Sequence, residues 1–218
     1  MYYNINNYNL QKDKFKMNKE TESIKPMEEE MVDTLIVKCA DKINELSNNK
    51  EANAFFENIA KENPQFKHLA NNVYQYKDYF INVGKQFLMM NHAIGLKRVN
   101  DYELTSAPKL IVYSDLKSNG DCVLITKIKD SENNPPIPYK LNSSNISLSS
   151  KKNLMNDVEL LAKEGIANVG IDDINNWHIV PKSGNIIISD WSTLASFEDD
   201  EAKIAYKNRI RKMLDLIY

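Results

Sequence analysis

The sequence is poor in glycine and in cysteine. Only six of its 218 residues are glycine, and a phosphate-binding loop of the form G-x-G-x-x-G is absent. The two cysteines, Cys39 and Cys122, lie far apart and lack the spacing of metal ligands. This excludes a disulfide framework and a zinc site of the usual kind, and both residues are expected to be small core residues.

The sequence also lacks a strong charge imbalance and a long apolar run. The net charge is -2, from 28 basic and 30 acidic residues, so no global attraction to nucleic acid or to an anionic membrane is expected. No apolar segment approaches the ~20 residues of a membrane span, and no signal peptide is recognised at the N-terminus. We therefore expect a soluble protein without a nucleic-acid partner.

The segment 165–194 combines apolar runs, a polar turn and clustered carboxylates. Asp172 and Asp173 follow one short apolar run and Asp190 follows another, and residues 182–185 between them have the composition of a hairpin turn. Such a hairpin brings its acidic ends together, where they repel unless they share a cation or a proton. A metal site, an acid/base site and a set of solvated turn aspartates are all consistent with this pattern.

The first half of the chain shows mostly helical spacing. Residues 1–28 are polar and without clear period, and we expect a flexible leader there. Apolar residues recur at helical spacing over 31–46, and again over 50–62 before a stop at Asn63-Pro64. For 65–100 the pattern favours helix, although parts of it also suit strands.

The second half alternates between strand and helix patterns. After Pro108 the sequence predicts a β-hairpin with its turn at Asn119-Gly120, and then a Pro- and Asn-rich connection. A helix follows with Ser149 or Ser150 as its N-cap and Gly165 at its end. A last amphipathic helix is expected over 201–217, with acidic residues at its start as the helix dipole prefers.

The order hairpin, connection, helix, carboxylate loop, short hairpin and Asp-aromatic resembles the C-terminal half of a protein-kinase-like fold. The match is to small divergent members, such as minimal kinases delivered as bacterial effectors and kinase-like proteins of phages. It covers roughly 108–195: residues 147–165 resemble the helix before the catalytic loop, 171–185 resemble that loop, and Asp190-Trp191-Ser192 stands where the family has Asp-Phe-Gly.

This resemblance implies an α+β fold with a reduced two-lobe architecture. Residues 29–128 would form an N-terminal lobe that is helix-rich with a β-hairpin, and 129–218 a C-terminal lobe that carries the catalytic-loop-like and Asp-Phe-Gly-like hairpin. The localisation would be cytoplasmic, or secreted into a host cell as an effector.

The resemblance also implies roles for individual residues in ATP- and Mg²⁺-dependent phosphoryl transfer. Asp173 would be the catalytic carboxylate, with Asp172 as its alternative, and Asp190 would hold the metal. The family has a metal-binding Asn five residues after its Asp. Counting from Asp173 reaches His178, whereas a slip of the loop brings Asn176 into this role, and Mg²⁺ prefers the oxygen ligand.

The phosphate-binding lysine is harder to assign. Lys38 fits the resemblance if 35–38 is a strand, with Glu51 or Glu57 as its ion-pair partner, but the helical period over 32–46 competes with that strand. In a helix, Lys38 is a solvated surface residue. The substitutes for it are Lys85, Lys97 and Lys109.

Three functions remain open at this point. The first is a phosphotransferase that acts on a protein hydroxyl. The second is a pseudokinase that keeps the fold without turnover. It is favoured by the missing glycines, among them the one that Ser192 replaces, and by the missing metal-binding Asn, whereas three retained carboxylates favour the first function; Gly170 and Ile171 also replace the family's His and Arg. The third is a mainly helical module that binds a protein partner, since fold does not settle function.

Overall fold

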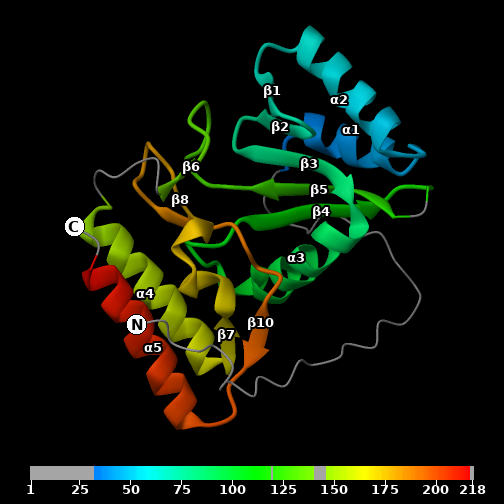
Figure 1. The fold of residues 1–218 in the computed structure, drawn as a ribbon. Helices are drawn as coiled ribbons and strands as arrows, with labels where there is room; N and C mark the ends of the chain where they lie inside the picture. Colours follow the sequence, from blue (N-terminus) through cyan, green and yellow to red (C-terminus); the bar gives the residue numbers. More distant parts are fainter. Residues whose placement is uncertain (1–31, 119, 140–145, 217–218) are drawn as a thin grey trace.

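The computed structural model describes residues 32–118, 120–139 and 146–216 (Figure 1). They form a mixed α+β fold with five α-helices and antiparallel sheets. The expected leader over 1–28 and part of the expected turn, Asn119, lie outside these residues. Within them, no helix is both long enough and apolar enough to cross a membrane.

The first half of the chain is built on a five-stranded antiparallel sheet in the order β1-β2-β3-β5-β4. Its strands, in chain order, are β1 (Phe66–Ala70), β2 (Val73–Tyr76), β3 (Tyr79–Lys85), β4 (Lys109–Asp115) and β5 (Asp121–Lys127). β5 lies inside the sheet between β3 and β4, and six of its seven residues are buried. An apolar run of this kind is expected where both faces of a strand are covered.

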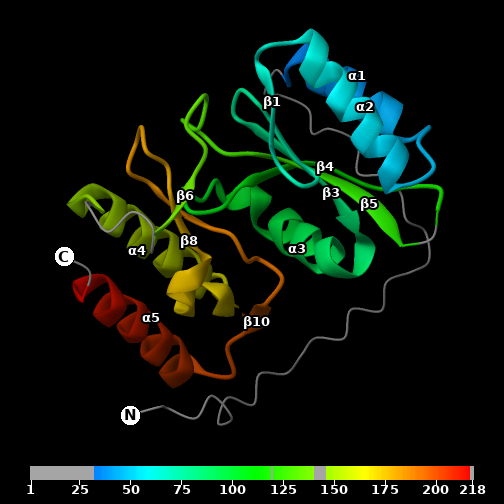
Figure 2. The same cartoon turned by 45° about the horizontal axis from the view of Figure 1, so that its top comes forward.

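Helices cover both faces of this sheet. α1 (Thr34–Ile43) and α2 (Asn49–Glu62) pack on one face and α3 (Gln86–Val99) on the other (Figures 1 and 2). Val123 and Ile125 of β5 join the core under α1 and α2, whereas Leu124 between them joins the core that contains α3. The alternation follows from the period of two residues in a strand.

The second half of the chain is assembled around two helices. α4 (Leu148–Lys163) and α5 (Asp200–Asp215) lie side by side, and short strands pack against them (Figure 1). The strands are β6 (Ile137–Pro138), β7 (Ile166–Asn168), β8 (Trp177–Ile179), β9 (Ile186–Ile188) and β10 (Leu194–Ser196). β6, β8 and β9 form one antiparallel sheet and β7 pairs with β10.

Several predicted elements are confirmed. Helices form where they were predicted at α1, α2, α4 and α5, and the hairpins β4–β5 and β8–β9 are present. Gly165 ends α4 with a positive φ of 74°, as a left-handed cap requires. The N-cap of α4 is Ser147, which accepts a hydrogen bond from the Ser150 amide, rather than Ser149 or Ser150.

The helix predicted over 65–100 is wrong for somewhat more than its first half, and with it the helix-rich N-terminal part. Residues 66–85 form β1, β2 and β3, and only 86–99 are helical. Asn72 and Lys77 have positive φ values of 63° and 52° and turn the chain between these strands. Neither turn contains an Asn-Gly or Asp-Gly pair, so the sequence carries no strong hairpin signal there. The apolar spacing then indicates a helix instead.

Candidate functional site

The loop between β7 and β8 folds through its own side chains. Two short 3₁₀ turns, η4 (Val169–Asp172) and η5 (Ile174–Asn176), follow one another. Each begins with a side chain that accepts from the backbone two residues ahead: Asn168 from the Gly170 amide at 2.8 Å, and Asp173 from the Asn175 amide at 2.9 Å. These are turns of the kind that Asn and Asp favour.

Asn168 connects this loop to Asp190 and to α5. Its side-chain nitrogen donates to the Asp190 carbonyl oxygen at 3.2 Å, while its backbone oxygen accepts from the Tyr206 hydroxyl at 3.1 Å. The same hydroxyl accepts from the Asn168 amide at 3.3 Å. Asn168 is fully buried, so these bonds satisfy polar groups that water does not reach.

Asn176 lies beside Ser189, the residue before Asp190, because the β8–β9 ladder extends past its strands. The Ser189 amide donates to the Asn176 carbonyl at 2.8 Å, which places Asp190 one residue from this contact. The side-chain nitrogen of Asn176 donates to the Gly170 carbonyl at 3.1 Å. The other polar atom of this side chain is therefore the oxygen, which is an acceptor. Asp190 accepts through Oδ1 from the amide and hydroxyl of Ser192 at 2.8 and 2.6 Å.

Two glycines allow the backbones around Asp190 and Trp191 to approach closely. A Cβ atom at Gly170 would lie 2.4 Å from the Asp190 carbonyl oxygen, and one at Gly95 of α3 would lie 1.8 Å from the Trp191 carbonyl oxygen. Both distances are far below contact, so neither position has room for a side chain. The loop, the segment after β9 and α3 therefore meet at the backbone of residues 190 and 191.

α3 contributes a histidine to the same place. His92 Nδ1 accepts a hydrogen bond from the Trp191 amide at 3.2 Å. Burial lowers the pKa of His92, and the charge of Asp190 opposes this shift, which indicates that the two side chains are near each other. The neutral imidazole is the form that can accept this bond. No sequence signal points to His92, since a lone histidine on a helix carries no motif.

The adjacent carboxylates of Asp172 and Asp173 have different environments. Asp172 is held by Arg209 of α5, whose Nε donates to Oδ1 at 3.0 Å and whose Nη2 contacts Oδ2. Burial raises the pKa of Asp172 to about 6, against the opposing effect of Arg209. Asp173 is exposed and accepts from the amide and the side chain of Asn175. Asp172 is thus occupied by an ion pair, whereas Asp173 faces solvent.

The structure places Lys38 and Glu51 away from a strand. Lys38 is exposed on α1, so the alternative strand at 35–38 does not form. Glu51 is exposed in the first turn of α2, where it accepts from the Ser47 amide at 2.8 Å. The assignment of Lys38 as a phosphate lysine depended on that strand, and it loses this support.

Lys85 is the lysine that ends the third strand of the sheet. Its Nζ forms an ion pair with Asp121 of β5. Asp121 also accepts from the amide of Asn49 at 2.9 Å. Lys97 is exposed in the last turn of α3, and Lys109 begins β4. The sequence could not rank these lysines, because the strand that Lys85 ends was predicted as helix.

His178 has a local backbone partner. It lies on β8, half-buried, with Nδ1 3.4 Å from the Asn176 carbonyl oxygen, and burial lowers its pKa. Across 32–118, 120–139 and 146–216, no group of three or more His, Cys, Asp or Glu residues could hold a metal ion. Asp190 and Asn176 nevertheless supply two oxygen donors. Mg²⁺ is usually bound by one or two carboxylates together with substrate phosphates, and carboxylate and amide oxygens are the types of ligand that it takes.

Comparisons with known proteins give little beyond this geometry. No protein-family model matches the chain, and a search of curated proteins finds no match. Among solved structures, the kinase PK-1 of the Cydia pomonella granulovirus is similar, with 16% sequence identity and a TM-score of 0.39. The likeness covers 67% of this chain and 60% of the viral kinase, and at this TM-score no inference is based on it.

Proposed function

We propose that this protein is a kinase-like phosphotransferase that moves a phosphoryl group from Mg²⁺-ATP to a protein hydroxyl. The observation that carries the proposal is the joining of the 168–176 loop to Asp190 through Asn168 and the Asn176–Ser189 backbone bond. Phosphoryl transfer needs a metal-holding carboxylate beside a loop that orients the attacking hydroxyl. Asp190 with Asn176 would hold Mg²⁺, and exposed Asp173 would orient the hydroxyl.

The order of elements also supports the proposal. In protein kinases a lysine on the third strand pairs with a glutamate of the helix called αC, and the catalytic loop and metal-binding Asp follow later in the chain. Here α3 follows β3 and contacts the Asp190–Trp191 segment through His92 and Gly95. Mg²⁺ would supply neutralisation of the phosphate charge, while Asn168 and Tyr206 keep the loop in place.

A second candidate function is a kinase-shaped binding protein without turnover. The observation that favours it is the state of the third-strand lysine: α3 contains no Asp or Glu, and Lys85 pairs with Asp121 of the sheet instead. Gly170, which stands where the family has His, lies against the Asp190 carbonyl and has no room for any side chain. Such a protein would bind a partner, and with Asp190 in place it could still bind a nucleotide.

Phosphate incorporation separates the two candidates. We expect intact-mass measurement after incubation with Mg²⁺-ATP and a generic protein substrate to show transfer by the native chain. Asp173→Asn keeps the acceptor oxygen for Asn175 but removes the charge, and should reduce transfer by roughly 10²–10⁴-fold while nucleotide binding persists. Asp215→Asn, an exposed change at the end of α5, is the matched control and should have no effect. Binding without transfer in the native chain would favour the second candidate.

A further inference from the structure

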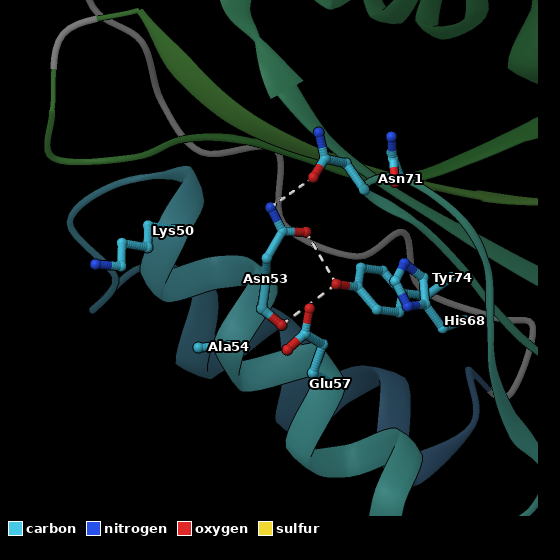
Figure 3. A pocket seen from close by; sticks show the side chains of 8 residues that line it. Lys50, Asn53, Ala54, Glu57, His68, Asn71 and Tyr74 are labelled. Atoms are coloured by element: carbon cyan, nitrogen blue, oxygen red, sulfur yellow. Dashed lines mark hydrogen bonds between the residues drawn. The ribbon is translucent and has the colours of Figure 1, made fainter.

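A pocket of about 360 Å³ lies between α2 and the β1–β2 hairpin. One wall is a single face of α2, with Lys50, Asn53 and Glu57 at helical spacing. The other wall includes His68 of β1 and Tyr74 of β2 (Figure 3). α2 and β1 lie at the opposite end of the molecule from α4 and α5 (Figure 1), so this pocket is separate from the candidate site at Asp190.

The aromatic wall of the pocket is rigidly held. The rings of His68 and Tyr74 stack with centroids 4.7 Å apart and an angle of 19° between their planes. The Tyr74 hydroxyl donates to Asn53 Oδ1 at 2.9 Å, and Asn53 in turn donates to Asn72 Oδ1 at 2.8 Å. Tyr74 is fully buried and His68 is exposed, so the imidazole presents a flat face backed by a fixed ring.

Glu57 supplies the negative charge of the pocket. Its carboxylate is drawn beside the Tyr74 hydroxyl in Figure 3, whereas the Lys50 ammonium points away from the ring pair. Lys50 and Glu57 are seven residues apart, which is about 10 Å along a helix axis. The pKa of Tyr74 is raised to about 12, first by burial and then by the charge of Glu57. The negative charge therefore acts within the pocket, and the positive charge lies at its far end.

We propose that this pocket binds a guanidinium group, such as the one that an arginine side chain carries. A planar guanidinium stacks on aromatic faces and donates two parallel hydrogen bonds to a carboxylate, which matches His68 and Glu57 on facing walls. A compact ammonium would use the carboxylate but not the flat imidazole. This site does not depend on the function proposed for Asp190, because it shares no residue with that region.

Titration of the intact protein with capped arginine amide, followed through the backbone amides of Asn53 and Asn72 by NMR, tests the proposal. We expect saturable shifts that weaken as salt rises, since the pocket is open and its charges are screened. Capped citrulline amide, the neutral isostere, should bind at least tenfold more weakly. Methylguanidinium, which carries the same single charge, separates a free guanidinium from a peptide-borne one: tighter binding of the capped amide would indicate a peptide, and equal binding a site that recognises guanidinium alone.

Glu57→Gln should weaken binding of capped arginine amide at least tenfold, and His68→Ala should weaken it several-fold. Both residues are exposed, so neither change should unfold the chain. Glu62→Gln makes the same charge change at an exposed position of the same helix, outside the pocket, and should alter the dissociation constant less than twofold. Equal binding of citrulline and arginine, or equal effects of Glu57→Gln and Glu62→Gln, would overturn the proposal.

Discussion

In the five-stranded sheet, backbone groups bond one another along whole strands, as between β3 and β5 from Tyr79–Lys127 to Lys85–Asp121. Around Asp190, by contrast, the buried backbone is held by single side chains such as Asn168, Tyr206 and His92. A ladder spreads its hydrogen bonds over many residues. In the loop region a single side chain makes several hydrogen bonds. The loss of one such side chain should therefore leave buried polar groups without partners.

The largest effect is expected where backbones touch. Gly95→Ala places a Cβ atom into the Trp191 carbonyl, and α3 must move away from the 190–191 segment to accommodate it. Overpacking of this kind costs about 3 kcal/mol of unfolding free energy. Urea unfolding measures it, with the exposed change Asn91→Ala on the same helix as control. A loss below about 1 kcal/mol would show that α3 and Trp191 do not pack this closely.

Removal of one tyrosine hydroxyl from the loop region and one from the five-stranded sheet compares the two regions directly. Tyr206→Phe leaves the buried amide and carbonyl of Asn168 without their partner and should cost about 2 kcal/mol. Tyr76→Phe in the sheet removes a bond to Asp33, which still accepts from Lys77 at 2.6 Å, and should cost less than about 1 kcal/mol. Equal losses in chemical denaturation would argue against the distinction between ladder and loop.

The pH dependence of stability should report on Asp172. Because the folded-state pKa is raised to about 6 from an ordinary value of 3.8, the folded chain binds the extra proton between these values. Stability from this group is full at pH below 3.8 and is lost as the pH rises through about 6. Relative to Asp172→Asn, the native chain should therefore lose on the order of 1–2 kcal/mol between pH 4 and pH 7. A gain in stability of the native chain over this range, relative to Asp172→Asn, would contradict a raised folded-state pKa of Asp172.

The smallest effect is expected for the ion pair that ends β3. Lys85 is more than half exposed, and Asp121 keeps the Asn49 amide and the Ser118 hydroxyl as partners. Lys85→Met should therefore change the unfolding free energy by less than about 1 kcal/mol. A loss of several kcal/mol in urea unfolding would mean that this end of the sheet, too, depends on one side chain.

Local signals in the sequence are enough to predict many of the helices and turns in the second half of the chain. Gly165 marks the end of α4 and residues 182–185 mark the β8–β9 turn, whereas the predicted N-cap of α4, Ser149 or Ser150, lies two or three residues past the cap that forms, Ser147. These features act within a few residues of where they stand in the chain. The bond between Asn176 and Ser189, next to Asp190, follows from that hairpin because the ladder continues past the strands.

Other features depend on contacts that are distant in sequence. Residues 66–85 have apolar positions that suit a helix, but β3 pairs with the buried strand β5, roughly 40 residues further along the chain, and β2 and β1 add to β3 in turn. The contacts of His92 with Trp191 and of Tyr206 with Asn168 join residues 99 and 38 positions apart. No local pattern predicts such contacts. For the same reason the sequence does not show that Asp172 forms an ion pair with Arg209 or that Asp173 is exposed.

The most direct test of the proposed site is the effect of Mg²⁺-ATP on the melting temperature of the native chain and of Asp190→Asn. At 100 times the dissociation constant, binding should stabilise the native chain by about 2.7 kcal/mol, or roughly 5–10 °C. Asp190→Asn keeps an acceptor for Ser192 but removes the charge that would hold Mg²⁺, and its shift should vanish. No shift of the native chain at millimolar Mg²⁺-ATP, or an equal shift in both proteins, would contradict a nucleotide site at Asp190.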